Sequence, residues 1–336
     1  MAEVALGALT TGRIAAVDER GSVTRGDLTL AWRVRARDRW IDPGTDASLR
    51  TSRPGPAPLA ETMLRVPGGD AIARTYAVGD HGGLVIVEVE NASPEAIAVA
   101  FAVRGASVDD VLALPRRPGA IEPDGAVVFP VPHRTVVRVA LGDPAVDVRT
   151  LADWQSVGRG WAAVLDRGMR TELPEPWQQR IDAARADALL APASAEAFVA
   201  LEDWGFDDEA AAMWPQLGMR ARHAARRRRA RTAVLGEMRA ALVHERRAGV
   251  DLLAGFRDEW LGAHLAVHDA PLRRGRVSFA LRWHGARPAL LWDAPKGSVL
   301  RVPSIDPSWM STDAVGETLL AAPADGKRVA TPESFT

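Results

Sequence analysis

Carboxylates that stand close together in the sequence are the first candidates for chemistry, because paired acids can act as a general acid and a general base. Glu202 and Asp203 are adjacent, and Asp207, Asp208 and Glu209 follow shortly after them. Neighbouring side chains on a helix diverge by about 100°, so Glu202 and Asp203 do not face one substrate atom. They remain weak catalytic candidates, with a solvated helix face as the alternative. Helix capping explains the second cluster better than catalysis does.

Tryptophan supplies a second kind of candidate site, since the chain has 11 tryptophans and 1 tyrosine. The flat C–H faces of sugar rings stack on indole. The tryptophans of the expected helical part could therefore line a carbohydrate cleft, and the candidates are Trp161, Trp177, Trp204 and Trp214. The alternative is that these indoles fill wide gaps between helices and sheets.

Residues 219–231, which read MRARHAARRRRAR, contain seven arginines and no acid. Four of them are consecutive and point round all sides of a helix, so they must be solvated or face an acidic surface. These candidate anion-binding residues are Arg226, Arg227, Arg228 and Arg229. Clustered arginines can bind nucleic-acid phosphates, but no aromatic residue interleaves here. A solvated linker is therefore the favoured interpretation of the run, with phosphate binding and a contact with an acidic surface as the alternatives.

Other familiar chemistries lack their sequence signals. The chain has no cysteine, which removes disulfides, thiolate catalysis and iron–sulfur clusters. The seven histidines are His81, His133, His223, His244, His264, His268 and His284. No HxH or HExxH spacing occurs among them, so we expect no metal site. The chain contains no GxSxG motif, no Walker loop and no GxGxxG motif, so we expect no cofactor.

Composition places the chain among ordinary globular proteins. It has 336 residues, 47% hydrophobic and 25% charged, with a formal net charge of -1. This length suggests about two domains, and the balanced charge disfavours nucleic acid or a membrane as partner. The N-terminal residues lack a basic region followed by an apolar run, and no stretch is long and apolar enough to span a bilayer. We therefore expect a cytoplasmic protein.

The elements follow from hydrophobic periodicity. Residues 28–35 alternate apolar and polar side chains, as a half-buried strand does, and residues 62–66 and 72–76 flank the turn-forming Pro67-Gly68-Gly69-Asp70. Further β-rich runs at 84–90, 97–104, 127–131 and 135–141 predict an antiparallel β-sandwich over residues 1–150.

The remaining chain changes character twice. Residues 151–248 carry apolar residues at helical spacing and predict a short segment of about four helices, with Ser194 and Asp207 as N-caps. Residues 249–320 return to alternation and predict an antiparallel β-unit, and residues 321–336 predict a mobile tail. The expected fold class is thus α+β multidomain. In the β-unit an apolar face that another layer must cover is shared by Val277, Phe279, Leu281 and Trp283. Trp260 and Trp292 are expected to help cover it.

Part of this layout resembles a known family. Residues 250–260 (VDLLAGFRDEW), 267–271 (VHDAP) and 274–279 (RGRVSF) resemble the C-terminal β-domain of bacterial six-hairpin glycosidases, and residues 161–190 resemble the linker and first helix that lead into their toroid. The resemblance implies an N-terminal sandwich, a toroid of twelve helices and glycoside hydrolysis. Twelve helices with their connections need roughly 200 residues, so residues 151–248 can hold only a shortened toroid.

These observations predict a carbohydrate-related protein that binds a sugar or assists an enzyme without intact catalysis. One alternative is an active glycoside hydrolase completed by oligomerisation. The other is an arginine-mediated nucleic-acid or phosphate binder.

Overall fold

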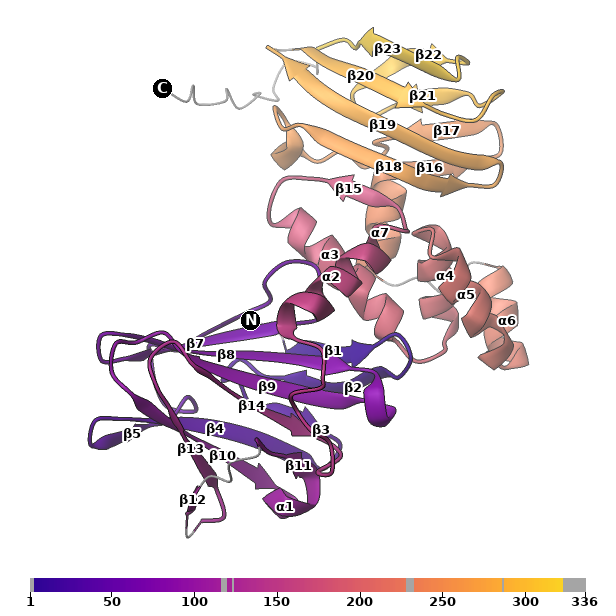
Figure 1. Ribbon diagram of the computed structural model, residues 1–336. Coiled ribbons are helices and arrows are strands. Elements are labelled where there is room, and N and C mark those ends of the chain that lie inside the picture. The colour runs from indigo at the N-terminus through magenta and orange to yellow at the C-terminus, as the bar shows by residue number, and fades with distance from the viewer. Residues whose placement is uncertain (1–2, 116–119, 123, 228–232, 286, 323–336) are drawn as a thin grey trace. The chain divides into compact units, whose positions relative to one another are not determined.

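The computed structural model describes residues 3–115, 120–122, 124–227, 233–285 and 287–322 (Figure 1). The chain forms two compact units, Met1–Ala162 and Ala163–Thr336. The fold is mixed α and β, and its sheets are mostly antiparallel. The first unit contains the predicted sandwich and the first part of the helical segment, whereas the second contains the rest of the helical segment and the C-terminal strands.

Two antiparallel sheets make up the first unit. The eight-stranded sheet has the order β1-β2-β3-β4-β10-β13-β12, with β5 paired to β4. Its strands are β1 (Val4–Ala8), β2 (Gly12–Val17), β3 (Val23–Arg25), β4 (Leu28–Ala36), β5 (Arg39–Ile41), β10 (Ile97–Arg104), β12 (Ala120–Ile121) and β13 (Val127–Val131). The six-stranded sheet has the order β11-β14-β9-β8-β7-β6. Its strands are β6 (Arg50–Ser52), β7 (Ala60–Val66), β8 (Gly69–Val78), β9 (Leu84–Asn91), β11 (Leu112–Ala113) and β14 (Val136–Leu141).

A single apolar core lies between these sheets, as the alternation predicts. In β4 the buried positions include Trp32 and Val34, and Phe101 of β10 lies opposite Trp32. Val87 of β9 belongs to the same core cluster, so both sheets contribute. The β7–β8 hairpin is also confirmed. Its turn contains Gly68 with φ 79°, a backbone conformation that glycine adopts without strain.

The helices begin near the end of the first unit. They are α1 (Val108–Val111) among the strands, then α2 (Trp154–Leu165), α3 (Trp177–Leu190), α4 (Ala195–Asp203), α5 (Asp207–Met213), α6 (Met219–Arg226) and α7 (Ala233–Leu242), with 3-10 turns η1 (Asp80–Gly82), η2 (Trp214–Gln216) and η3 (Asp258–Trp260). Six of these seven α-helices, α2 to α7, lie in the segment 151–248, where about four were predicted. Gly158 and Gly160 weaken the helical signal of α2. Because α7 follows the arginine run closely, the sequence alone shows α6 and α7 as one continuous helical stretch.

One predicted helix cap is confirmed and one is wrong. Ser194 precedes α4, and its Oγ accepts a hydrogen bond from the Ala197 N–H at 3.1 Å. Phe206, and not Asp207, is the N-cap of α5. The Asp207 carboxylate instead pairs with the Arg276 guanidinium at 2.9 Å, and an arginine partner competes with the backbone N–H groups for the same oxygens.

Two sheets complete the second unit. The five-stranded sheet has the order β15-β18-β19-β20-β23, and the four-stranded sheet has the order β16-β17-β21-β22. The strands are β15 (Arg170–Glu172), β16 (Val243–Arg246), β17 (Gly249–Leu252), β18 (Leu265–Leu272), β19 (Gly275–His284), β20 (Arg287–Asp293), β21 (Leu300–Val302), β22 (Asp306–Ser311) and β23 (Val315–Leu319). The β17–β21 pair is parallel, so the purely antiparallel prediction is corrected. Because β15 lies between α2 and α3 and pairs with β18, the helical segment is tied to the C-terminal strands.

The apolar face predicted for β19 is buried at three of its four positions, whereas Trp283 is only half-buried. Val277 and Leu281 have no exposed surface and Phe279 is 3% exposed. Trp292 lies beside Phe279 in the register of β20, and the Trp309 ring of β22 packs on it at 5.2 Å between centroids. The four-stranded sheet therefore supplies the covering layer. Most of the predicted tail, residues 323–336, lies outside the described residues.

Candidate functional site

The connection between α4 and α5 is a rigid part of the second unit. Trp204 is fully buried, and its Nε1 donates to the carbonyl of Leu235 in α7 at 3.2 Å. The Trp204 carbonyl accepts the Met169 N–H at 2.7 Å. Gly205 follows with φ 77°, a conformation that suits glycine at the end of a helix. The residues on either side of this turn are consequently held in fixed positions.

A polar cleft of about 330 Å³ opens beside this turn. It is lined by side chains from α4, α5, α7, β16 and the β18–β19 turn: Glu202, Asp203, Asp207, Gly236, Arg239, Ala240, Val243, His244, Glu245, Pro271, Leu272 and Arg273. Two of these residues are the carboxylates singled out in the sequence, Glu202 and Asp203. The structure thus brings them to one wall of a cleft, together with Asp207.

Arg239 fixes the frame of the cleft. Its Nε donates to the Asp203 carbonyl at 3.1 Å, and its two terminal nitrogens donate to the carbonyls of Val243 and Pro271. A guanidinium presents its donors in one rigid plane. This one side chain therefore holds the end of α4, the start of β16 and the end of β18 in register, and its positive charge lies at the cleft wall.

The rim contains further contacts between opposite charges. The Glu245 oxygens accept the Arg273 N–H at 3.2 and 3.3 Å, and Arg276 reaches Asp207 from the neighbouring strand. The lining holds four carboxylates against two guanidinium groups, with His244 exposed at the edge. The lining therefore offers both acceptors and donors and contains more carboxylates than guanidinium groups, while Asp207 pairs with Arg276 and Glu202 and Asp203 have contacts of their own.

The sequence did not predict the other half of this lining. Arg239, Glu245 and Arg273 carry no motif, and Glu245 and Arg273 are separated by 28 residues. They meet only because β16, in one sheet, lies beside the β18–β19 turn of the other sheet. The acidic character of positions 202–203 was the single signal of the site available from the sequence.

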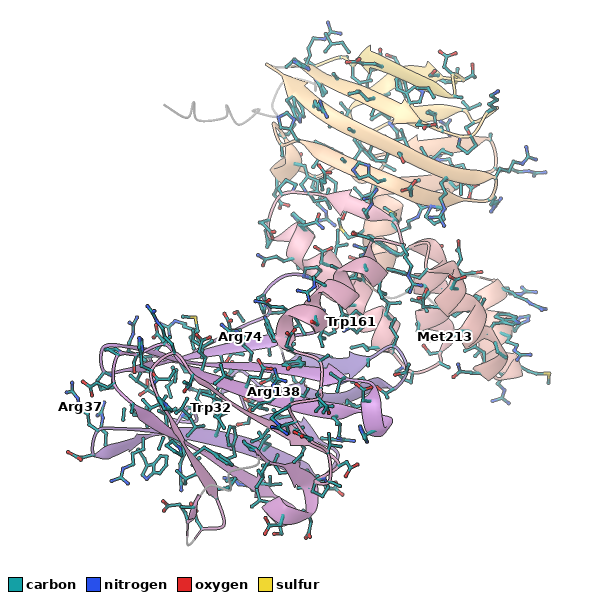
Figure 2. All side chains as sticks on the ribbon, viewed as in Figure 1. Trp32, Arg37, Arg74, Arg138, Trp161 and Met213 are labelled. Carbon is teal, nitrogen blue, oxygen red and sulfur yellow. The ribbon has the colours of Figure 1, made fainter. Side chains whose placement is uncertain are left out.

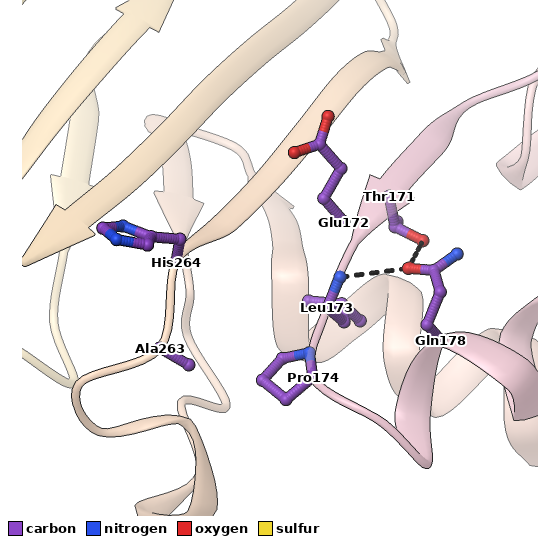
Figure 3. A pocket seen from close by; sticks show the side chains of 7 residues that line it. All are labelled: Thr171, Glu172, Leu173, Pro174, Gln178, Ala263 and His264. Carbon is purple, nitrogen blue, oxygen red and sulfur yellow. Dashed lines mark hydrogen bonds between the residues drawn. The ribbon is translucent and has the colours of Figure 1, made fainter. Parts of the chain in front are cut away.

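A second cleft of about 560 Å³ is shallower, and its lining is Thr171, Glu172, Leu173, Pro174, Gln178, Ala263 and His264 (Figure 3). The Gln178 carbonyl oxygen already accepts hydrogen bonds from the Thr171 hydroxyl at 3.2 Å and the Leu173 N–H at 3.0 Å. Glu172 is turned away from Gln178 and pairs with His268 at 3.1 Å. Its lining contains one carboxylate and no guanidinium group, so it offers fewer charged groups than the polar cleft and is the weaker candidate.

Two of the four candidate tryptophans are too deeply buried to contact a sugar. Trp161 is 6% exposed and Trp204 has no exposed surface, so the prediction that they contact a ligand is wrong for both. Figure 2 shows Trp161 on α2. Trp177 and Trp214 are half-buried. The guanidinium of Arg257 lies 4.2 Å from the centroid of Trp177.

Trp214 is covered in the same way. Arg222 and Arg226 lie over its ring at 5.5 and 5.4 Å from the centroid, and Phe198 packs on it at 4.9 Å between centroids. None of the four candidate tryptophans lines either cleft. These indoles pack in the interior and against arginine, which is the alternative that the residue type left open.

The arginine candidates are only partly described. Arg226 and Arg227 end α6 and are exposed, whereas Arg228 and Arg229 lie outside the described residues. Among the residues that are described, no group of three or more His, Asp or Glu side chains is arranged to hold a metal ion. No described helix is both long and apolar enough to cross a membrane.

A buried polar network in the first unit went unnoticed in the sequence. The Tyr76 hydroxyl donates to the Glu88 carboxylate, and Arg138 pairs with the same carboxylate at 2.5 Å. Tyr76 is fully buried, and burial followed by the hydrogen bond to Glu88 raises its pKa well above the usual range. The signal available in the sequence was that Tyr76 is the only tyrosine and lies on the same side of its strand as Arg74. Figure 2 labels Arg138 at this place.

This network fastens the segment that leads out of the first unit. Arg138 also donates to the carbonyls of Val148 and Leu151 at 3.3 Å each, and Tyr76 packs edge-on against Trp154 at 5.8 Å between centroids. Its groups are used up by these structural contacts, so it is not a second ligand site.

Comparison with protein-family models, with curated proteins and with solved structures finds no match to this chain. The function of the protein is therefore inferred from the residues of the cleft and from their physical chemistry.

Proposed function

We propose that the protein binds a small polyhydroxylated ligand of the carbohydrate class in the polar cleft of the second unit, without hydrolysing it. The observation that carries the proposal is the lining, in which Glu202 and Asp203 face a pocket shared with Arg239, Glu245 and Arg273. Each sugar hydroxyl is both a donor and an acceptor, so it needs a wall that offers both. The six-hairpin resemblance of residues 250–279 supports the same ligand class.

Size and charge narrow the ligand further. A cleft of about 330 Å³ is at the small end of ligand pockets and suits one or two sugar rings. Its excess of carboxylates disfavours phosphorylated sugars and uronic acids, because like charges repel. It favours neutral sugars and, above all, amino sugars, whose ammonium group can pair with a carboxylate.

The arrangement offers little support for hydrolysis. Glycosidases need two carboxyl groups that face each other across the bond to be cleaved. Glu202 and Asp203 are neighbours on one helix, and both Asp207 and Glu245 contact arginine or its backbone N–H. We therefore expect binding without turnover.

The test is a thermal-shift panel on the purified full chain, with glucosamine, glucose, N-acetylglucosamine, glucuronate and glucose 6-phosphate as probes. The expected order of stabilisation is glucosamine first, the neutral sugars next and the two anionic sugars last, because binding to the folded state stabilises it by mass action. Stabilisation by the anionic sugars alone, or by none of the five, would contradict the proposal.

A panel of aryl glycosides tests the absence of catalysis. We expect no release of the aryl group. Release that is lost in Asp203→Asn would instead support an active hydrolase.

A further inference from the structure

The exposed side chains of α6 form a continuous basic stripe, which the proposed sugar site does not use. The stripe consists of Met219, Arg220, His223, Arg226 and Arg227, all exposed. With 3.6 residues per turn these positions fall on one side of the helix. The opposite side contains Ala225, which is 2% exposed, and α6 packs there against α4. Hence the stripe is fixed on the folded unit and points to solvent.

The three arginines of the stripe lack acidic partners. Among the described residues, Arg220, Arg226 and Arg227 form no ion pair, whereas many arginines elsewhere in the same unit do, as in Arg167 with Glu209 and Arg276 with Asp207. Uncompensated positive charge on a surface attracts polyanions. The stripe thus differs in kind from the paired surfaces around it.

Trp214 positions one of these arginines. The Arg226 guanidinium lies over the indole at 5.4 Å from its centroid. Stacking uses the flat face of a guanidinium and leaves its N–H edge available. On the same ring Arg222 differs, because its nitrogens donate to the carbonyls of Trp214 and Pro215 at 3.3 and 2.9 Å. Arg226 is therefore oriented in advance, and its donors are directed to an external acceptor.

We infer that the α6 stripe binds the phosphate backbone of a nucleic-acid duplex, without reading its sequence. Arginine forms bidentate hydrogen bonds with phosphate oxygens. Arg220 and Arg227 are about 10 Å apart along the helix axis, and phosphates of one strand follow each other at about 3.4 Å along the duplex axis. Three arginines can thus meet about three phosphates.

Two other polyanions fit the stripe less well. A single-stranded nucleic acid needs open aromatic faces on which bases stack, and Phe198, Arg222 and Arg226 already pack on the ring of Trp214. An anionic membrane surface needs an apolar face to insert, and Met219 is the only apolar member of the stripe.

The test is fluorescence anisotropy of the full chain with a labelled DNA duplex of about 20 base pairs at several salt concentrations. Three phosphate contacts give a slope of about −2.7 in log affinity against log salt, or a loss of about 40-fold between 50 and 200 mM salt. The triple variant Arg220→Gln/Arg226→Gln/Arg227→Gln should weaken binding by about tenfold or more at low salt and reduce the steepness of the slope by about 2.7.

A matched triple variant controls for net charge. Arg104→Gln/Arg247→Gln/Arg274→Gln removes the same charge from exposed positions elsewhere and should leave the slope nearly unchanged. Circular dichroism confirms that both variants fold. Equal losses in the two variants, or an unchanged slope in the α6 variant, would overturn the inference. Binding to phosphatidylserine vesicles without binding to the duplex would also overturn it. None of these three outcomes bears on sugar binding, which is measured separately in the thermal-shift panel.

Discussion

The outer face of the six-stranded sheet and the exposed stripe of α6 are both rich in arginine, yet they use it in opposite ways. Across the sheet, Glu61, Arg74, Glu88 and Arg138 lie side by side on four successive strands, so that acid and base alternate. Arg74 reaches Glu61 at 3.1 Å and Glu90 at 2.7 Å. Figure 2 shows Arg74 and Arg138 on this face.

On α6 the arginines have no such neighbours among the described residues. The difference shows that a net charge of -1 says little about this protein, because the charges are paired in one place and separated in another. Paired arginines stabilise the fold, and unpaired arginines are available to a partner. The predictions that follow test this division.

The largest effect is expected for Glu88→Gln in the sheet network. Glu88 is 6% exposed and receives both the Tyr76 hydroxyl and the Arg138 guanidinium. Removing its charge leaves the largely buried Arg138 guanidinium without its directly paired carboxylate, which should lower the free energy of unfolding by about 3 kcal/mol. Urea unfolding measures this value. The matched change Glu61→Gln, at the half-exposed end of the ladder, should cost less than about 1 kcal/mol. Similar losses of unfolding free energy in Glu88→Gln and Glu61→Gln would contradict the distinction between the buried and the half-exposed carboxylate.

The Tyr76 hydroxyl gives a pH-dependent effect of intermediate size. Because burial and Glu88 raise its pKa in the folded state, this group contributes full stability below about pH 10, the pKa of an unfolded tyrosine. Above pH 10 the unfolded state loses the proton first, and stability should fall by about 1.4 kcal/mol per pH unit. Tyr76→Phe should abolish this dependence.

Tyr76 can be observed directly, since it is the only tyrosine of the chain. Phenolate absorbance should stay absent from the folded protein up to about pH 11 and appear when urea unfolds it. Phenolate formation near pH 10 in the folded state would show that the hydroxyl is not buried.

The smallest effect is expected on α6. Arg226→Gln/Arg227→Gln should change the free energy of unfolding by no more than about 0.5 kcal/mol, as exposed substitutions usually do. A loss of several kcal/mol in urea would show that these arginines support the fold, and would end the contrast with the sheet.

Much of the fold could be predicted from local pattern. β-Rich runs between turn-forming residues located β10 and β13 at their observed ends, and Ser194 marked the start of α4. Features that depend on distant residues could not be predicted. The parallel pairing of Val250 with Leu300 joins segments fifty residues apart, and nothing in either segment announces it.

The site was predictable only where it is local. Glu202 and Asp203 reached the cleft wall, as acids at the end of a helix can. Arg239 was missed because its role arises from carbonyls on three separate elements. Trp204 was misassigned since residue type shows that an indole packs well but not how deeply it is buried.

The most direct test of sugar binding in the cleft is calorimetric titration of glucosamine into the full chain and into Glu202→Gln/Glu245→Gln. The account predicts binding to the native chain and at least a tenfold loss in the double variant, about 1.4 kcal/mol or more. The control Glu259→Gln/Glu317→Gln removes the same charge from exposed positions outside the cleft and should bind as the native chain does. Equal affinities for all three proteins would contradict the assignment of the ligand to this cleft.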